Sequence, residues 1–394
     1  MGLPGHLSDP GDRPERARAR SFDRHRLPQA PEPKGNGSVI DRSFSRRRIG
    51  QVALATSASF AARTTSWATA QESGATWHQV TPPDPVPAPR WDHTLAAHHD
   101  GKKLVLFGGR SSEGVGLGDT WVFSRTRNVW TSIDTRAPSP RFGHAIAART
   151  DDSGFFLFGG QSDDRFFNDV WFYDFESDRW RQVHEGSNRG PSPRYGTSLV
   201  ATGRAALLLS HGFTNEGRFD DTWRFDIEDE SWEELTPPKV ADRPLKRCLH
   251  EAVWSEQSNR MLLFGGCSSG SGPCPQGDLW AFDPSRSRWR EITRDTGPGA
   301  RSNPGLVYDR PRQRALIFGG LTDNGYDNTL WSLSDTEGEN RTWSELLVSG
   351  DVPPARASHD SVITGPHLYV SSGTGGIGAF NDLWTIDVSA LGSS

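Results

Sequence analysis

The chain has 394 residues, of which 34% are hydrophobic, and it carries a formal charge of −5 with only 3 cysteines. No apolar run approaches the roughly 18 residues of a membrane-spanning helix, and three cysteines are too few for a disulfide scaffold or a four-cysteine zinc site. The 15 tryptophans, 42 glycines and 27 prolines favour many short strands joined by tight turns.

The N-terminal part of the chain predicts no folded domain. Residues 1–42 are rich in Arg, Pro and Asp without an apolar period, which indicates a disordered extension. A basic patch with Arg46 and Arg47, a mildly apolar stretch over 51–62 and an Ala-Thr-Ala end follow. This pattern predicts a twin-arginine export signal over 43–70, and hence a periplasmic or extracellular protein. A basic disordered tail is the alternative interpretation.

The rest of the chain, residues 71–394, is acidic. Residues 1–70 hold 12 basic and 6 acidic residues, which leaves a net charge of −11 on the remainder. A body this acidic is a poor candidate for binding nucleic acid. It also has no long basic amphipathic segment, so we expect no membrane insertion or surface binding.

Internal repeats fill residues 71–394. An apolar strand ending in a glycine pair recurs every 51–54 residues, and the first position of the pair is occupied by Gly108, Gly159, His211, Gly265, Gly319 and Ser372. A strand with a tryptophan follows each time, at Trp121, Trp171, Trp223, Trp280, Trp331 and Trp384. In five repeats an aspartate stands two residues before that tryptophan: Asp119, Asp169, Asp221, Asp278 and Asp382. Six similar units predict a repeat architecture.

A second tryptophan opens a further strand in each unit except the last. The missing strand is found at the other end of the repeats, where Trp77 lies in a segment, 76–80, that matches 179–183. The N-terminal strand is therefore expected to complete the last unit. Such closure removes the exposed sheet edges that an open array would leave.

A fourth element in each unit is opened by an arginine, at Arg90, Arg141, Arg194, Arg247, Arg301 and Arg356. Four strands in each of six units predict an all-β fold, a six-bladed β-propeller over 71–394. The glycine pair, the Asp-x-Trp strand and the second tryptophan resemble kelch repeats, and among these a bacterial exported protein of the galactose-oxidase-like type. We expect the tryptophans to fill the space between blades and the aspartates to accept hydrogen bonds from backbone amides at turns.

The resemblance to kelch propellers implies that the six arginines open the innermost strands, beside the mouth of the central channel. Two interpretations stay open. Some arginines could bind a carboxylate, sulfate or phosphate at the mouth, or each could pair with a group of its own ring and be structural. The presence of an arginine in every unit favours the structural interpretation.

Residues that break the repeat are better candidates for a ligand site. Asp92, Asn303 and Ser358 stand two places after an arginine, where other units have glycine or leucine. Asp92 near several arginines is expected to have a depressed pKa in a salt bridge. Tyr195 follows Arg194 and could flank a ligand, as could Trp91 and Phe142 in the same place; packing is the alternative for all three. His211 replaces a glycine only in its own unit, whereas His93, His144, His250 and His359 recur and indicate core histidines.

The cysteines offer one expected bridge. Cys267 and Cys274 bracket a Ser-Gly-rich segment, and after export a disulfide would close that loop. Metal or redox use is the alternative. Cys248, directly after Arg247, is expected to be a buried free thiol.

The sequence predicts a binding protein rather than a known kelch enzyme. It lacks the copper ligands of the oxidases, the iron motif of the plant specifier proteins and any nucleophile elbow or phosphate loop. We therefore expect an exported monomer, without a cofactor, that binds a protein or an anionic small molecule or carbohydrate through its loops and channel mouth. The alternative is a metal-free enzyme such as a sugar-acid isomerase or mutarotase, with Asp92 or a loop glutamate moving the proton.

Overall fold

The computed structural model describes residues 74–98, 100–163, 165–268, 274–293, 297–334 and 341–391. All of them belong to one compact unit, Trp67–Ser394. The predicted disordered extension and export signal, 1–70, lie outside the described residues.

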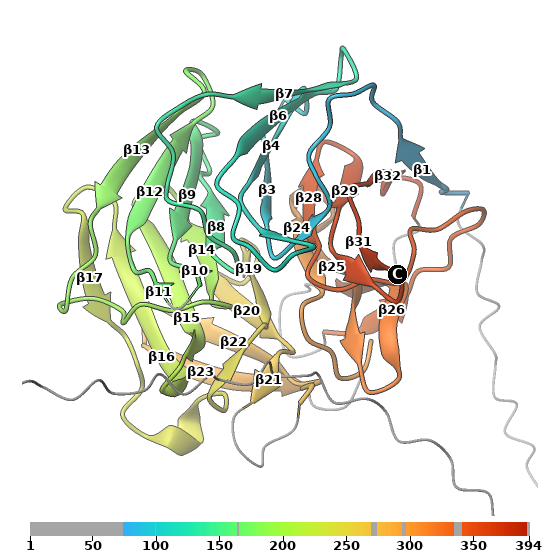
Figure 1. Cartoon of the computed structure of the whole chain (residues 1–394). Coiled ribbons are helices and arrows are strands. Elements are labelled where there is room, and N and C mark those ends of the chain that lie inside the picture. Colours follow the sequence, from blue (N-terminus) through green and yellow to red (C-terminus); the bar gives the residue numbers. More distant parts are fainter. Residues whose placement is uncertain are drawn as a thin grey trace, which may run out of the picture. The chain divides into compact units, whose positions relative to one another are not determined.

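Six antiparallel blades, each with four main strands, follow one another along the chain (Figure 1). Two short connecting strands extend the sheet of the third blade to six strands. The first strands of the blades are β3 (Thr94–Ala97), β8 (Ala145–Ala148), β14 (Ser198–Thr202), β19 (Glu251–Ser255), β24 (Gly305–Asp309) and β28 (Asp360–Thr364). Their second strands are β4 (Lys103–Phe107), β9 (Gly154–Phe158), β15 (Ala206–Thr214), β20 (Arg260–Phe264), β25 (Arg314–Thr322) and β29 (His367–Ser371). Their third strands are β6 (Thr120–Ser124), β12 (Val170–Asp174), β16 (Gly217–Asp226), β22 (Leu279–Asp283), β26 (Gly325–Ser334) and β32 (Leu383–Asp387).

The fourth, outermost strands are β7 (Val129–Ile133), β13 (Arg179–His184), β17 (Ser231–Glu234), β23 (Arg288–Thr293), β27 (Trp343–Glu345) and, in the last blade, β1 (Trp77–Val80). Strand β1 pairs antiparallel with β32, with Trp77 opposite Ile386, and Figure 1 shows the blue β1 beside the red β32. The six-bladed propeller and its closure by the N-terminal strand are confirmed.

Short strands form pairs in the connections on one face. They are β2 (Arg90–Trp91) with β5 (Arg110–Ser111), β10 (Gln161–Ser162) with β11 (Arg165–Phe166), β18 (Arg247–Cys248) with β21 (Cys267–Ser268), and β30 (Thr374–Gly375) with β31 (Gly378–Ala379). Two 3-10 turns, η1 (Val240–Asp242) and η2 (Arg310–Arg312), complete the described elements.

Aromatic side chains hold adjacent blades together. The tryptophan of an outermost strand packs against a phenylalanine of the second strand of the preceding blade. The ring centroids are 4.9 to 5.4 Å apart in the pairs Trp180–Phe107, Trp232–Phe158, Trp343–Phe264 and Trp77–Phe318. Because Trp77 makes this contact from the N-terminal strand, closure places the last blade against its neighbour in the same way as the others.

The glycine pairs are required by backbone geometry. Gly108 has a φ of 62°, and a Cβ at this position would lie 2.7 Å from the carbonyl oxygen of Arg141. His211 and Ser372, which replace the first glycine in two repeats, adopt the same left-handed conformation with φ of 59° and 53°. These two blades therefore accept backbone strain that the other four avoid.

Candidate functional site: the channel and the loop face

The six repeated arginines are buried, with exposures between 0% and 2%, and each reaches an aspartate of its own blade. Arg247 shows the arrangement: its two Nη atoms donate to the two oxygens of Asp278, both at 2.7 Å, and Nη1 also donates to Gly265 O at 2.8 Å. Asp278 in turn accepts from Trp280 Nε1 at 2.7 Å. Four other pairs have the same two bonds at 2.5 to 3.0 Å: Arg90–Asp119, Arg141–Asp169, Arg194–Asp221 and Arg356–Asp382.

The fifth blade departs from this pattern. Arg301 donates a single hydrogen bond to Asp327, at 3.2 Å, and Asp327 accepts further hydrogen bonds from Thr329 N and Oγ1. The indole of Trp331 donates to the Thr329 hydroxyl instead of to a carboxylate. A threonine thus stands where the other five blades have the aspartate.

These contacts favour the structural interpretation of the arginine ring. The guanidinium groups are committed to the aspartates of the Asp-x-Trp strands and do not open onto the channel mouth. The aspartates also differ from expectation, because side chains of Arg and Trp, rather than turn amides, are their main donors. Burial alone would raise the pKa of Asp278, but the hydrogen bonds and charge of Arg247 hold that pKa below its ordinary value.

A closed circle of backbone hydrogen bonds surrounds one end of the channel. Its six members, here called the rim, stand two places after each arginine: Asp92, Gly143, Gly196, Leu249, Asn303 and Ser358. Each backbone N–H donates to the carbonyl of the rim residue in the preceding blade, at 2.8 to 3.1 Å, and Asp92 N closes the circle on Ser358 O. All six residues have φ between 50° and 60°. The four without glycine are therefore held in a conformation that side chains disfavour.

Asp92 does not have the depressed pKa that was expected from a salt bridge. Burial raises its pKa to about 6, against the opposing hydrogen bond from Ser358 and the more distant charge of Arg110. The expected depression of its pKa is absent because the ring arginines turn away to their own aspartates. Asp92, Asn303 and Ser358 all line the channel, so the structure does bring these three candidates together.

The other two candidates are not among the residues that line the channel cavity. Tyr195 lies over Gly143 at the mouth, and a Cβ added to Gly143 would lie 2.1 Å from the tyrosine ring. The Tyr195 ring also contacts Phe142 and Phe213 edge-on. His211 is fully buried: Arg194 Nη1 donates to its carbonyl at 2.9 Å, and Nδ1 bonds Ser210 Oγ. It is a blade residue, not a channel residue.

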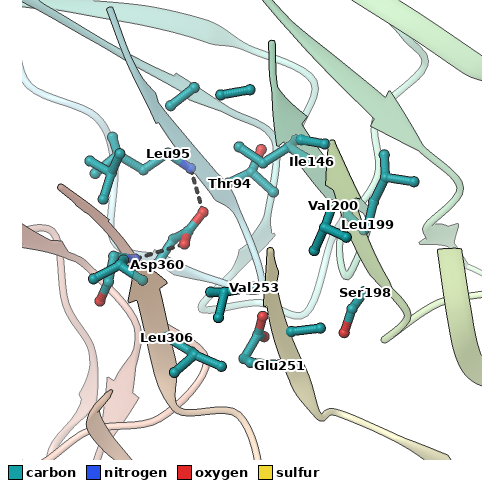
Figure 2. Close-up of a pocket in the computed structure, with 18 of the residues that line it drawn as sticks. Thr94, Leu95, Ile146, Ser198, Leu199, Val200, Glu251, Val253, Leu306 and Asp360 are labelled. Atoms are coloured by element: carbon teal, nitrogen blue, oxygen red, sulfur yellow. Dashed lines mark hydrogen bonds between the residues drawn. The ribbon is translucent and has the colours of Figure 1, made fainter. Parts of the chain in front are cut away.

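The channel is a cavity of about 470 Å³ enclosed by the six first strands. Two carboxylates project from its wall, Glu251 at the start of β19 and Asp360 at the start of β28 (Figure 2). Asp360 accepts Leu95 N at 2.6 Å and Ser361 N at 2.7 Å. For Glu251 the described residues supply no hydrogen-bond donor. Sequence reasoning missed both residues, although they occupy the same repeat position as Thr94.

Burial shifts the carboxyl groups of Glu251 and Asp360 toward their protonated forms. Burial raises the pKa of Asp360 to about 7. Burial raises the pKa of Glu251 well above its ordinary value, and the nearby charges of Asp360 and Asp92 raise it further. A carboxyl that is protonated at neutral pH can donate a proton, which an ordinary carboxylate cannot.

The recurring histidines are core residues, as expected. Burial lowers the pKa of His93 and of His250 to about 3, so both stay neutral near pH 7. His144 Nε2 bonds Thr94 Oγ1 across the blade boundary at 2.9 Å. Among the described residues no group of three or more His, Cys, Asp or Glu side chains is arranged to hold a metal ion.

One face of the propeller carries the exposed apolar side chains. The connections between second and third strands and those between blades pair with each other on this face, here called the loop face. Seven large apolar side chains are exposed among the described residues. Five lie in these connections, namely Val115, Val240, Leu245, Leu347 and Ile377, and two, Leu321 and Tyr326, lie where β25 and β26 meet at the turn on this face. The hairpin turns of the opposite face contribute none of them.

Three arginines on the loop face lie over aromatic rings. The Arg110 guanidinium is 5.0 Å from the ring centre of Phe142 and 5.9 Å from that of Trp91. Two further stacks, at 5.6 and 4.9 Å, are Arg218–Phe213 and Arg165–Phe167. Within the described part of the chain these three arginines have no carboxylate at ion-pair distance. Arg110 Nε donates to Gly114 O at 3.1 Å and Arg218 Nε to Cys248 Sγ at 3.3 Å. The Nη groups of these arginines are the donors that a carboxylate of another molecule would meet.

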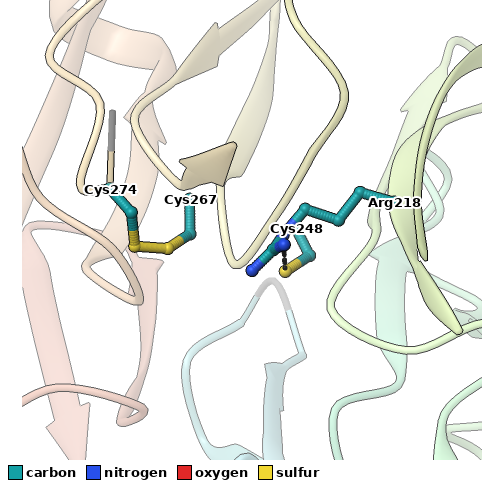
Figure 3. The surroundings of a disulfide bond; sticks show 4 residues. All are labelled: Arg218, Cys248, Cys267 and Cys274. Carbon is teal, nitrogen blue, oxygen red and sulfur yellow. Dashed lines mark hydrogen bonds between the residues drawn. A yellow bond between two sulfur atoms is a disulfide. The ribbon is translucent and has the colours of Figure 1, made fainter. Parts of the chain in front are cut away.

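The Cys267–Cys274 disulfide is present in the structure and Cys248 is a buried free thiol, as expected (Figure 3). Cys248 lies on β18 directly opposite Cys267 on β21. Arg218 Nε donates to Cys248 Sγ at 3.3 Å. The disulfide therefore stands at the edge of the loop face. No helix among the described residues is long and apolar enough to cross a membrane.

Comparison with known proteins identifies the family. Putative adagio-like protein 2 of Oryza sativa subsp. japonica is 29% identical over 333 residues, which are 79% of this chain and 50% of that protein. Adagio protein 3 of Arabidopsis thaliana is 29% identical over 281 residues, 67% of this chain and 44% of its own. An F-box/kelch-repeat protein of Arabidopsis thaliana is 28% identical over 274 residues, 62% of this chain and 55% of its own. The chain thus spans about half the length of these relatives, which are eukaryotic and not of the expected bacterial exported type. The family model KLHDC2/KLHL20/DRC7 Kelch-repeats domain matches residues 61–241 and 236–391, and the chain belongs to this kelch-repeat family.

Proposed function

We propose that the propeller is a protein-binding domain. Its loop face binds a segment of a partner protein that contains both acidic and apolar residues. The observation that carries this proposal is the placement of all seven exposed large apolar side chains of the described residues on that one face. Large apolar side chains gathered on one face are typical of protein interaction sites.

The charges of the loop face indicate the chemistry of the partner. Arg110, Arg165 and Arg218 lie over aromatic rings without a carboxylate at ion-pair distance in the described structure. A carboxylate of the partner would accept two hydrogen bonds from such a guanidinium edge. Arginine and aromatic side chains are also the residues that contribute most to binding at protein interfaces. The partner is therefore a protein segment that alternates acidic and apolar residues.

The test uses a fluorescein-labelled peptide of alternating leucine and glutamate, measured by fluorescence anisotropy. The double variant R110A/R218A should weaken binding at least tenfold, and added salt should weaken the wild-type interaction. R127A is the matched control, because Arg127 is an exposed arginine in the turn between β6 and β7, on the opposite face. An equal weakening in R127A, or tighter binding of a leucine–lysine peptide, would refute the proposal.

A second candidate function is a metal-free isomerase acting in the channel. Glu251 and Asp360 favour it, since two converging carboxyl groups with raised pKa can donate and accept protons at neutral pH. The test is anomer exchange in a panel of sugar acids followed by NMR. Catalysis lowered about 100-fold or more in E251Q would support the isomerase, and absence of exchange by the wild type contradicts it. Binding of an anionic small molecule or carbohydrate stays a prediction. The six repeated arginines do not support it, because each is bonded to an aspartate of its own blade.

Export is part of the proposal as well. The twin-arginine pattern of residues 43–70 and the Cys267–Cys274 disulfide support it, because such bridges persist in oxidising compartments. Arg46→Lys together with Arg47→Lys should leave unprocessed precursor inside the cell, detected by immunoblotting of cell fractions. Normal secretion of this double variant would refute twin-arginine export.

A further inference from the structure

All three cysteines of the chain meet at one edge of the loop face. Cys248 and Cys267 are directly opposite each other in the antiparallel pair β18–β21, and Cys267 is bridged to Cys274 (Figure 3). Opposite residues of an antiparallel pair point to the same face of the sheet, with Cα atoms about 4.5 to 5.5 Å apart. This lies within the range of about 4.4 to 6.8 Å that a disulfide spans. The register therefore places Cys248 where it could bond to Cys267.

The surroundings of the thiol determine when it can react. Cys248 is only 2% exposed, and its sulfur points toward Arg218 in Figure 3. Burial raises the pKa of Cys248, against the hydrogen bond and positive charge of Arg218, so the thiol is protonated at neutral pH. The thiolate is the reactive form. Cys274, in contrast, is exposed.

We propose that Cys248 exchanges with the Cys267–Cys274 disulfide, which replaces a bridge with one exposed cysteine by a buried bridge across β18 and β21. Cys248 gives its proton to water, and its thiolate attacks Cys267 Sγ. The Cys248–Cys267 bond forms as the Cys267–Cys274 bond breaks, and the electron pair leaves on Cys274 Sγ, which then takes up a proton. One disulfide and one thiol stand on each side of the reaction, so neither oxidant nor reductant is consumed.

The exchange regulates the loop face, an inference that rests on the proposed function. In the structure Arg218 is held from two sides, by the Cys248 thiol through Nε and by the Phe213 ring. After exchange the Cys248 sulfur is bonded to Cys267 and turned away from Arg218. The guanidinium then keeps only one of its two restraints and has a free N–H for a carboxylate of the partner. The two disulfide forms are thus expected to differ in affinity for an acidic segment.

The exchange itself is tested by alkylating the native protein with N-ethylmaleimide at pH 7 and pH 9, followed by peptide mapping with mass spectrometry. We expect alkylated Cys274 together with a Cys248–Cys267 linkage, accumulating faster at pH 9. C248S should show no alkylation of Cys274, and its circular dichroism checks that it is folded; C248A is the second variant if it is not. Unmodified Cys274 in the wild type, or equal modification in C248S, would overturn the exchange.

The effect on docking is measured with the two locked forms and the leucine–glutamate peptide. C248S retains the Cys267–Cys274 bridge, whereas C274S can form only the Cys248–Cys267 bridge, which mapping verifies. We expect C274S to bind the peptide severalfold more tightly than C248S. Equal affinities of C274S and C248S for the peptide would overturn the regulation of the loop face. The exchange itself is decided separately by the alkylation experiment. Absence of binding in the wild type and in both variants overturns the docking function instead.

Discussion

Removing one arginine of the buried ring should cost far more in the fourth blade than in the fifth. Arg247→Ala leaves Asp278, whose side chain is 6% exposed, without two hydrogen bonds of 2.7 Å. It also removes the donors to Gly265 O and Leu245 O. Breaking a buried, hydrogen-bonded ion pair from one side costs about 3 to 5 kcal/mol. We expect the free energy of unfolding of R247A to fall by about 4 kcal/mol.

Arg301→Ala is the matched comparison. This substitution removes a single hydrogen bond to Asp327, of 3.2 Å, and the Asp327 side chain is 24% exposed. The Asp327 carboxylate keeps the hydrogen bonds from Thr329 N and Oγ1. The substitution also removes the hydrogen bonds that Arg301 donates to the carbonyls of Gly319 and Pro298. Each hydrogen bond to a carbonyl contributes about 1 kcal/mol, and the long bond to the partly exposed Asp327 carboxylate contributes little because water can replace it. The expected cost is therefore about 2 kcal/mol.

The assay is unfolding in guanidinium chloride, followed by tryptophan fluorescence and extrapolated linearly to water. The double variant R247A/D278A should cost less than the sum of the single variants, because the two residues interact directly. Equal costs for R247A and R301A would refute the reasoning. A phosphate-induced rise in the melting temperature of the wild type that is absent from a stably folded R247A would restore the anion-binding interpretation of the ring.

Three further outcomes follow from the same structure. Deleting residues 75–82 removes β1 and the buried Trp77, which should cost at least about 3 kcal/mol and expose the edge of β32; an unchanged melting temperature and no increase in light scattering would contradict closure of the last blade. Glu251→Gln should raise the free energy of unfolding at pH 8 more than at pH 4: the folded state retains the proton of Glu251 where the unfolded state has released it, so wild-type stability falls as pH rises. An equal change at both pH values, or the same profile in a control variant of the exposed Glu228, would contradict this. Gly154→Ala should destabilise by about 2 to 4 kcal/mol in thermal and chemical unfolding, because its Cβ would lie 1.9 Å from Tyr173 O, whereas Gly376→Ala meets nothing within 4 Å and should stay within about 0.5 kcal/mol of the wild type.

The sequence predicts the architecture because each blade repeats the same short sequence motifs. The apolar strand, the glycine pair and the Asp-x-Trp strand are contiguous within each unit, and Trp77 matches Trp180 closely enough to reveal the closure. The disulfide was predictable because Cys267 and Cys274 stand at the two ends of one short loop. These features are short-range, so a single sequence displays them.

The candidate site was less predictable because its contacts are long-range. Arg247 and Asp278 are 31 residues apart, and nothing in the sequence says that one side chain reaches the other. Glu251 and Asp360 face one cavity only after six first strands are arranged in a ring. The exposed apolar residues, such as Ile377, were unremarkable members of variable loops until the topology placed all of these loops on one face.

The rim has a consequence for how such a channel can change its chemistry over time. Its circle of six hydrogen bonds runs from main chain to main chain, so the width of the opening depends on the number of blades and not on the side chains there. Asp92, Leu249, Asn303 and Ser358 are therefore substituents on an aperture of constant diameter. A lineage could replace an acid by an amide, a hydroxyl or an alkyl group at these places without redesigning the scaffold. The side chains that decide what can pass through the opening can therefore change while the propeller stays folded.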